Sequence, residues 1–309
     1  MQRTSAVIIG IAVLVLAAVI GFVLFSPQSG DEPEATASAP PASPDATPSA
    51  SAASELLDRR WTVLYVGTDL NTRREEAGDP VNADAIMLVS LSADQSQLTL
   101  VSLPRDTVDV PLPDGGTYDG KVNALYREQG MDALVGAMET LFGLPIDAHV
   151  KLDMDDFATL VGAVGGVEVS PDEPIVDPIV NLDLEPGTQM LDASQALGYV
   201  RTRIDQDYGR MGRQQEVLQE LVRRLVAEDA EVDLRSVLDG LDSLETDLPL
   251  DQLGELMEVA RRATSAQVTE LVISPPLVTF EGDRDDGRGY VLEIDEEAVR
   301  TEVQGLIGD

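Results

Sequence analysis

Residues 61–107 read WTVLYVGTDLNTRREEAGDPVNADAIMLVSLSADQSQLTLVSLPRDT, and this stretch decides the fold of the chain. Its three apolar, β-rich runs, WTVLYVG, AIMLVSL and LTLVSL, are separated by polar segments, which predicts three buried strands. Pro104 cannot donate a hydrogen bond to a central ladder, so we expect the third strand to end there. Farther along, strand-like runs alternate with helical patterns. The sequence therefore predicts an α/β fold with a mixed central β-sheet flanked by helices.

Polar residues mark the ends of these three predicted strands. Asp69 follows the first strand, Asp84 precedes the second, and Arg105 and Asp106 follow the third. Ligands of such sheets gather at the carboxyl ends of strands, and Mg²⁺ is held by a few carboxylates together with phosphate oxygens. Taken singly, either aspartate also fits a turn or a helix cap. Their combination with arginines predicts a metal and phosphate site at this edge of the sheet.

A second stretch, LGYVRTRIDQDYGRMGRQQ at residues 197–215, concentrates positive charge in a chain whose formal net charge is -35. Its four arginines are Arg201, Arg203, Arg210 and Arg213. The first two share a face if residues 199–203 form a strand, and the last two share a face if a helix begins near position 210. Guanidiniums this close repel one another unless an anion lies between them, and the arginine fork suits phosphate oxygens.

This arginine stretch therefore predicts a clamp for phosphate or pyrophosphate. The alternative is an ordinary surface network in which nearby carboxylates neutralise the arginines: Asp205, Asp207 and Glu216.

Two segments between the strands and the arginine stretch are expected to be amphipathic helices, because their apolar residues recur at helical spacing. The first carries Met131, Leu134, Val135, Met138, Leu141 and Phe142, and the second carries Phe157, Leu160, Val161 and Val164. By periodicity alone, both faces fit an ordinary core.

The remainder of the chain is predicted to continue the alternation of strands and helices. Asp192 is expected to cap a helix over residues 193–197, and a further helix runs to about Ala227. Later expected elements are helices over 234–244 and 250–263, a strand at 271–274 and a strand-helix unit over 290–307. Residues 58–309 show no internal repeat and no second domain boundary, so we expect one domain there.

The N-terminal segment predicts a membrane anchor. Residues 6–25 contain no charge and as a helix would span about 30 Å, the thickness of a bilayer core. The run is longer than the apolar region of a cleaved signal peptide, about 7 to 15 residues. Arg3 precedes it and acids follow it, which places residues 1–5 in the cytoplasm. Residues 26–57, rich in Pro, Ala and Ser, predict a disordered stalk before the extracytoplasmic domain 58–309.

Composition excludes several classes of function. The chain has no cysteine, which rules out disulfides and thiolate nucleophiles, and its one histidine, His149, makes a histidine metal cluster or a Ser-His-Asp triad improbable. Strong acidity argues against binding to nucleic acid, because the basic footprint is missing outside the arginine stretch.

Several motifs resemble those of the LytR-CpsA-Psr family, enzymes that attach glycopolymers to bacterial cell walls. The matching segments are 64–69 (LYVGTD), 84–88 (DAIML), 102–107 (SLPRDT), 121–124 (KVNA), 165–167 (GGV), 197–203 (LGYVRTR), 207–210 (DYGR) and 213–214 (RQ). Their order and spacing make the resemblance specific over residues 61–227, and weaker likeness continues towards the C-terminus.

The resemblance implies an αβα sandwich and a membrane-held phosphotransferase. Its donor would be a glycopolymer on a polyprenyl pyrophosphate, its acceptor a peptidoglycan hydroxyl, and its metal Mg²⁺, with Mn²⁺ as the alternative. By position, Asp69 and Asp84 would hold the metal. The catalytic, pyrophosphate-binding arginines would be Arg105, Arg201, Arg203 and Arg213, assisted by Lys121, Arg210 and Gln214. The family's apolar pocket for the polyprenyl chain would be walled by Val135, Met138, Leu141, Phe142, Phe157, Leu160 and Val161.

One departure from the family pattern concerns the second aspartate. Members usually carry Arg-Ser before it and Thr after it, whereas this chain has Asn82, Ala83 and Ala85. A degenerate, non-catalytic wall or lipid-binding module therefore remains an alternative, as does a pyrophosphatase that uses water as acceptor. A transcriptional regulator is excluded, because only five residues precede the predicted membrane helix.

Overall fold

The computed structural model describes residues 56–225, 244–249, 252–263 and 265–308. The predicted membrane helix, nearly all of the predicted stalk and nearly all of the helix expected over 234–244 lie outside these ranges. Within the described ranges, no helix has both the length and the apolar character that a membrane crossing requires.

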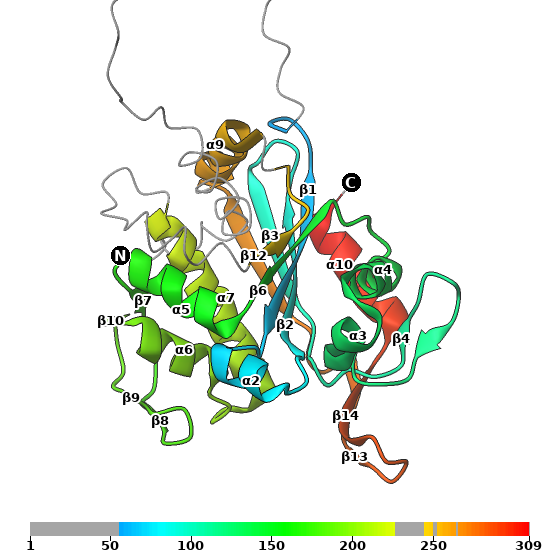
Figure 1. The fold of residues 1–309 in the computed structure, drawn as a ribbon. Helices are drawn as coiled ribbons and strands as arrows, with labels where there is room; N and C mark the ends of the chain where they lie inside the picture. The colour runs from blue at the N-terminus through cyan, green and yellow to red at the C-terminus, as the bar shows by residue number, and fades with distance from the viewer. Residues whose placement is uncertain (1–55, 226–243, 250–251, 264, 309) are drawn as a thin grey trace, which may run out of the picture.

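A six-stranded mixed sheet forms the centre of the domain (Figure 1), in the order β11-β6-β1-β2-β3-β12. Its strands are β1 (Trp61–Thr68), β2 (Ala83–Leu91), β3 (Gln97–Ser102), β6 (Ala148–Leu152), β11 (Glu245–Thr246) and β12 (Gln267–Val272). The pairs β1/β2, β2/β3 and β6/β11 are antiparallel, whereas β1/β6 and β3/β12 are parallel. The predicted mixed sheet is thus confirmed.

Helices cover both faces of this sheet (Figure 1). One face carries α5 (Met154–Ala163), α6 (Ala193–Arg201), α7 (Gln206–Leu225) and α9 (Leu253–Ala263), and the other carries α3 (Val122–Gln129), α4 (Met131–Phe142) and α10 (Glu296–Ile307). Side chains of a strand alternate between faces, so Val63 and Tyr65 of β1 enter the first core while Leu64 and Val66 enter the second. This burial on both sides explains the continuous apolar runs of the sequence.

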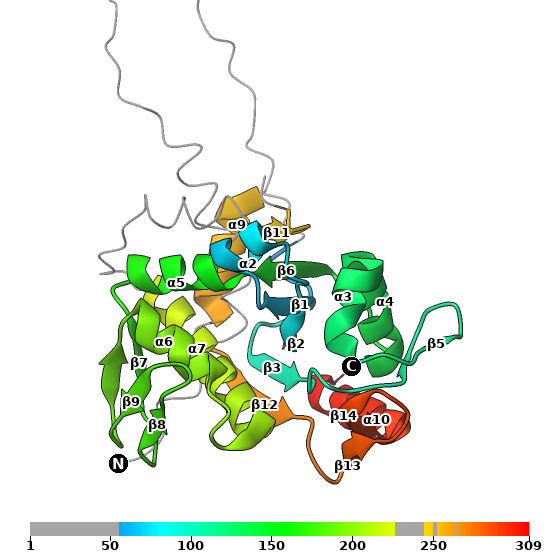
Figure 2. The same ribbon diagram turned by 60° about the horizontal axis from the view of Figure 1, so that its bottom comes forward.

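Smaller elements surround the sheet (Figure 2). They are α2 (Thr72–Ala77) and four two-stranded antiparallel pairs: β4 (Val110–Pro111) with β5 (Thr117–Tyr118), β7 (Val167–Val169) with β10 (Gln189–Leu191), β8 (Ile175–Asp177) with β9 (Leu182–Leu184), and β13 (Val278–Arg284) with β14 (Gly289–Ile294). The backbone conformation just before β7 requires a glycine at position 166. Gly166 has φ 98°, and a Cβ there would lie 2.5 Å from the carbonyl oxygen of Leu191.

The structure differs from the sequence prediction at several elements. β6 is a strand, although residues 148–151 were assigned to no element. The expected helix that carries Met131 is preceded by a separate helix, since Gly130, with φ 89°, lies between α3 and α4. Residues 199–203 do not form a strand, because the helix capped by Asp192 continues to Arg201. Asp84 lies within β2 rather than before it, and β13 was not expected.

Candidate functional site

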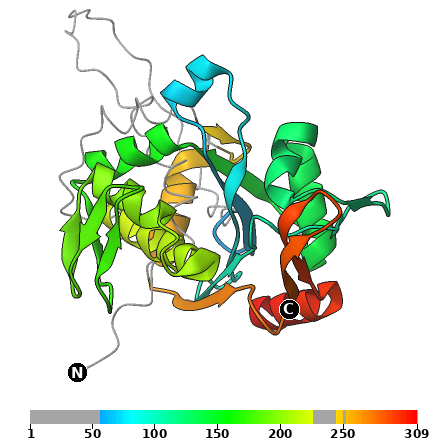
Figure 3. The same ribbon diagram turned by 90° about the horizontal axis from the view of Figure 1, so that it is seen from below.

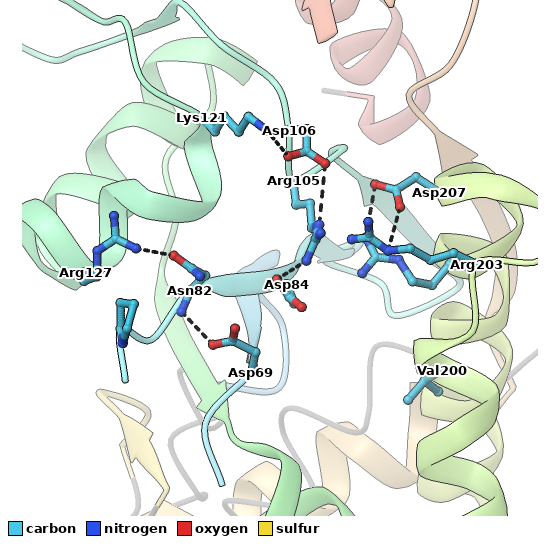
Figure 4. A network of polar contacts seen from close by, with 12 residues as sticks. Asp69, Asn82, Asp84, Arg105, Asp106, Lys121, Arg127, Val200, Arg203 and Asp207 are labelled. Carbon is cyan, nitrogen blue, oxygen red and sulfur yellow. Dashed lines mark hydrogen bonds and ion pairs between the residues drawn. The ribbon is translucent and has the colours of Figure 1, made fainter. Parts of the chain in front are cut away.

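The antiparallel pairing of β1, β2 and β3 brings three chemically important strand ends to one edge of the sheet (Figure 3). β1 ends beside the start of β2, since Thr68 pairs with Ala83, and β3 ends beside Met87 of β2. Asp69, Asp84 and Arg105 therefore lie close together, as Figure 4 shows. Segments up to 36 residues apart in the sequence build one site.

Each carboxylate at this edge has an arginine partner. Asp69 accepts a hydrogen bond from the backbone N–H of Asn82 at 2.8 Å, and its other oxygen lies 3.0 Å from a guanidinium nitrogen of Arg74. Asp84 pairs with Arg105. Asp106 lies 3.0 Å from the Lys121 ammonium and 3.6 Å from Nε of Arg105. Opposite charges thus alternate along the edge (Figure 4).

The junction between α6 and α7 contributes further arginines. Arg203 and Arg210 share the carboxylate of Asp207, at 3.4 Å and 3.3 Å. Arg201 ends α6, and within the described ranges its side chain forms no hydrogen bond or ion pair. The junction therefore carries positive charge that its own carboxylates do not fully pair.

Arg210 is the most constrained of these cations. Its side chain is 3% exposed, and its Nε has no hydrogen-bond partner in the described part of the chain. Burial, with a smaller contribution from the positive charges of Arg105 and Arg203, lowers the pKa of Arg210 to about 10 against the opposing effect of Asp207. Arg210 stays protonated at neutral pH, but its buried charge lowers the stability of the folded protein. An anion beside it would remove that cost.

Arg105 is in the opposite electrostatic position. Burial lowers its pKa, but Asp84 and Asp106 outweigh burial, so the pKa of Arg105 is raised overall. Arg105 is thus matched by carboxylates, whereas Arg210 is not. The unmatched charge of the site lies on the α7 side.

A cavity of about 370 Å³ opens at this edge, and its lining residues fall into two chemically distinct groups, the charged part and the apolar part. The charged part is lined by Asp69, Arg74, Asp84, Arg105, Arg201, Arg203, Arg210 and Gln214. The apolar part is lined by Leu152, Met154, Phe157, Ile179, Val180, Leu197, Val200 and Leu218. A ligand with an anionic head and an apolar tail matches both parts.

Two residues predicted to bind pyrophosphate do not line this cavity. Lys121 pairs with Asp106 behind the charged part. Arg213 is 6% exposed, and its guanidinium donates to the carbonyl oxygens of Tyr199 at 2.9 Å and Thr202 at 2.6 Å and pairs with Asp205. Arg213 therefore fixes the chain between α6 and α7, where Arg201 and Arg203 lie.

Most of the residues predicted to wall a lipid pocket lie elsewhere. Val135, Met138, Leu141 and Phe142 of α4 pack on the opposite face of the sheet, and Leu160 and Val161 are fully buried in the core under α5. Only Phe157 of that set lines the cavity. Helical periodicity showed that α4 buries one side but could not show which face of the sheet it covers.

Sequence reasoning missed Arg74 and the β8–β9 turn. Arg74 lies in α2, whose N-cap Asn71 accepts a hydrogen bond from the Arg74 N–H. In the sequence, this segment indicates only a polar loop between two strands. Ile179 of the turn lines the cavity although its side chain is 94% exposed. Such an exposed apolar side chain indicates a binding surface, but its exposure can be read only from the structure.

The described residues test whether this edge suits a divalent cation. They contain no cluster of three or more Asp, Glu, His or Cys side chains with metal-ligand geometry. Two aspartates, Asp69 and Asp84, do line one cavity together with arginines. Mg²⁺ commonly takes one or two protein carboxylates and completes its shell with phosphate oxygens and water. The donor set therefore fits Mg²⁺ that arrives with a phosphorylated ligand.

The chain is thus an αβα sandwich with an arginine-rich, partly apolar cavity at the sheet edge. The chain matches the LytR_cpsA_psr family over residues 30–303 and belongs to that family.

Relatives and solved structures agree with this assignment. The chain is 37% identical to the probable cell wall biosynthesis protein LcpB of Corynebacterium glutamicum over 54% of this chain and 38% of the relative. It is 31% identical to the polyisoprenyl-teichoic acid–peptidoglycan teichoic acid transferase TagU of Enterococcus faecalis over 63% of this chain and 64% of the relative. The match thus spans less than two thirds of either relative. The fold is similar to that of TagV of Bacillus subtilis, with TM-score 0.65 and 23% identity over 81% of this chain and 98% of that one.

The two kinds of arginine predict different outcomes for the same substitution. Arg201→Lys keeps the charge but loses the planar fork, so we expect inorganic pyrophosphate to bind about tenfold or more weakly while the free energy of unfolding stays within about 0.5 kcal/mol of wild type. Arg213→Lys loses two buried carbonyl contacts, so the free energy of unfolding should fall by about 2 to 4 kcal/mol.

Calorimetric titration and urea unfolding of both variants measure these two quantities. Arg262→Lys, which changes an exposed arginine of α9 paired with Glu258, is the matched control and should alter neither. Unchanged pyrophosphate affinity in Arg201→Lys would contradict the clamp. Unchanged stability in Arg213→Lys would contradict the structural role of that residue.

Proposed function

We propose that the protein is a phosphotransferase that moves a glycopolymer phosphate from a polyprenyl-pyrophosphate carrier to a peptidoglycan hydroxyl. One observation carries this proposal: the incompletely neutralised Arg210 lies in a cavity whose other part is apolar. A polyprenyl pyrophosphate has the two matching parts. Relatives named as teichoic acid transferases support the choice of reaction and substrates.

The transfer step balances as a single displacement at phosphorus. The oxygen of the acceptor hydroxyl forms a bond to the phosphorus that carries the glycan, and the bond from that phosphorus to the bridging oxygen breaks. Polyprenyl phosphate leaves with the bridging oxygen, and the proton of the hydroxyl is released. Negative charge develops on the leaving phosphate in such a step.

Arginines at the cavity would stabilise this developing charge. Arg105 is held in place by Asp84, and Arg203 and Arg210 are held by Asp207, so little reorganisation is required when the charge forms. Arg201, exposed at the end of α6, is free to follow the phosphate oxygens. The apolar residues of α5, α6 and the β8–β9 turn would hold the carrier chain, at about 0.8 kcal/mol per buried methylene.

Mg²⁺ is the proposed cofactor, with Mn²⁺ as the alternative, and Asp69 and Asp84 would hold it. When bound, it would offset charge on the phosphoryl oxygens. Asn82, where members of the family usually have arginine, instead accepts a hydrogen bond from Arg127 and donates its backbone N–H to Asp69. The chain thus keeps a guanidinium near this position, supplied by α3 (Figure 4).

A radiolabelled transfer assay tests the proposed reaction and its metal. Asp84→Asn should lower Mg²⁺-dependent transfer by about a hundredfold or more and lower the unfolding midpoint only modestly, because Arg105 loses the charge of Asp84 but keeps Asp106. Asp132→Asn, an exposed carboxylate of α4 remote from the cavity, is the control. Transfer that is equal in the Asp84 variant, or that persists in excess EDTA, would contradict the metal site. Label that appears only as free phosphorylated glycan would identify a pyrophosphatase instead.

We also propose that residues 6–25 anchor the chain in the cell membrane, with residues 1–5 cytoplasmic and the domain 58–309 outside. The uncharged run between Arg3 and the acids that follow it supports this topology. Protease added to intact protoplasts should degrade the domain, whereas its protection would overturn the proposed orientation.

A further inference from the structure

We propose that the β13–β14 hairpin and the first turns of α7 form the binding site for the acceptor glycan, with Tyr290, Tyr208 and Glu281 as its contact residues. This inference rests on the proposed transferase function, because it concerns the second substrate of the same reaction. It assigns a role to a hairpin that the donor site does not use.

The hairpin is attached directly to the segment that carries the site. Leu292 of β14 donates its N–H to the carbonyl oxygen of Asp106 and accepts from the N–H of Val108, both at 3.0 Å. Thr107 and Leu292 form a parallel bridge. The base of the hairpin is thus hydrogen-bonded to the residues that follow Arg105, and its position is fixed relative to the cavity.

One face of the hairpin turns towards α7. Glu281 pairs across the hairpin with Leu292, and Asp283 pairs with Tyr290, so these four residues share a face. On that face, the Tyr290 hydroxyl donates to one oxygen of Glu281, and the hydroxyl of Tyr208, from α7, donates to the other at 2.9 Å. Burial, reinforced by the hydrogen bond and charge of Glu281, raises the pKa of both tyrosines, so both remain protonated donors.

This tyrosine pair lies beside the reactive part of the cavity. Tyr208 follows Asp207, the carboxylate that holds Arg203 and Arg210. Tyr290 shares Glu281 with Tyr208, and it lies two residues before Leu292, whose N–H donates to the carbonyl oxygen of Asp106. In Figure 3 the hairpin and the start of α7 flank the end of the sheet.

The tyrosines lie away from the apolar part of the cavity. That part is built by α5, α6, the β8–β9 turn, Leu152 at the end of β6 and Leu218 of α7. Leu218 is about 15 Å along α7 from Tyr208, and α5 directly follows β6 on one side of the sheet order. The hairpin is attached next to β3, which lies towards the other side. In a phosphoryl transfer the attacking and leaving oxygens are roughly in line. With the carrier chain in the apolar part, the acceptor hydroxyl must approach from the hairpin side.

The chemistry of this face suits a sugar. Tyr290 is 43% exposed, and an aromatic ring offers flat apolar area to the C–H face of a pyranose at little cost in side-chain entropy. Glu281 is exposed and can accept additional hydrogen bonds from sugar hydroxyl or acetamido groups. An N-acetylated hexosamine chain, neutral and rich in donors, would not be repelled by the acidic surroundings.

Binding of a β-1,4-linked N-acetylglucosamine tetramer to the full-length chain tests this site. Tyr290→Ala should weaken tetramer binding about tenfold, since the stacked ring and its buried apolar area are both lost. Tyr290→Phe keeps the ring and should retain most of the affinity. Phe280→Ala is the matched control, because Phe280 pairs with Glu293 on the opposite face of the same hairpin and stacks on Arg284.

Parallel titration with inorganic pyrophosphate separates this inference from the proposed function. We expect all three variants to bind pyrophosphate as wild type does. Unchanged tetramer affinity in Tyr290→Ala, an equal loss in Phe280→Ala, or no tetramer binding by a wild-type chain that binds pyrophosphate would overturn the acceptor site alone. Failure of the wild-type chain to bind pyrophosphate would instead overturn the proposed function.

Discussion

Arg210 carries a buried positive charge beside Arg105 and Arg203, with Asp207 as its one close carboxylate among the described residues, and the rest of the site depends on that arrangement. Buried cations of like sign destabilise a fold unless carboxylates or a ligand compensate them. The neighbouring carboxylates outweigh burial at Arg105 but not at Arg210. On the proposed function, an anionic ligand would therefore stabilise the protein most beside Arg210.

The fold supplies the rigidity that such an arrangement needs. Antiparallel pairing of β1, β2 and β3 fixes the carboxylates and Arg105, and Arg213 fixes the α6–α7 junction through two backbone carbonyls. Arginines only two or three positions apart thus have different roles. The guanidinium of Arg213 is turned towards carbonyl groups and holds the backbone, whereas that of Arg210 lines the cavity.

Much of this site could be predicted from the sequence, and the reasons are local. WTVLYVG, AIMLVSL and LTLVSL are apolar on both faces, and the polar residues at their ends follow from where each run stops, so Asp69, Asp84 and Arg105 were identified together. The clustering of Arg201, Arg203 and Arg210 is also visible in sequence. Tertiary packing could not be predicted in the same way. Periodicity does not show that α4 covers the face opposite the cavity, or that the guanidinium of Arg213 turns inward. β6 was missed because its alternating residues, AHVKL, are few and are followed at once by α5.

The central claim is that the arginines at the sheet edge bind a diphosphate, and the thermal unfolding midpoint of the wild-type chain in increasing inorganic pyrophosphate tests it most directly. A ligand that binds only the folded state raises the midpoint progressively with its free concentration. We expect pyrophosphate to raise it well above the value reached in sodium chloride of equal ionic strength. Identical midpoints in the two salts at every ionic strength would contradict the account.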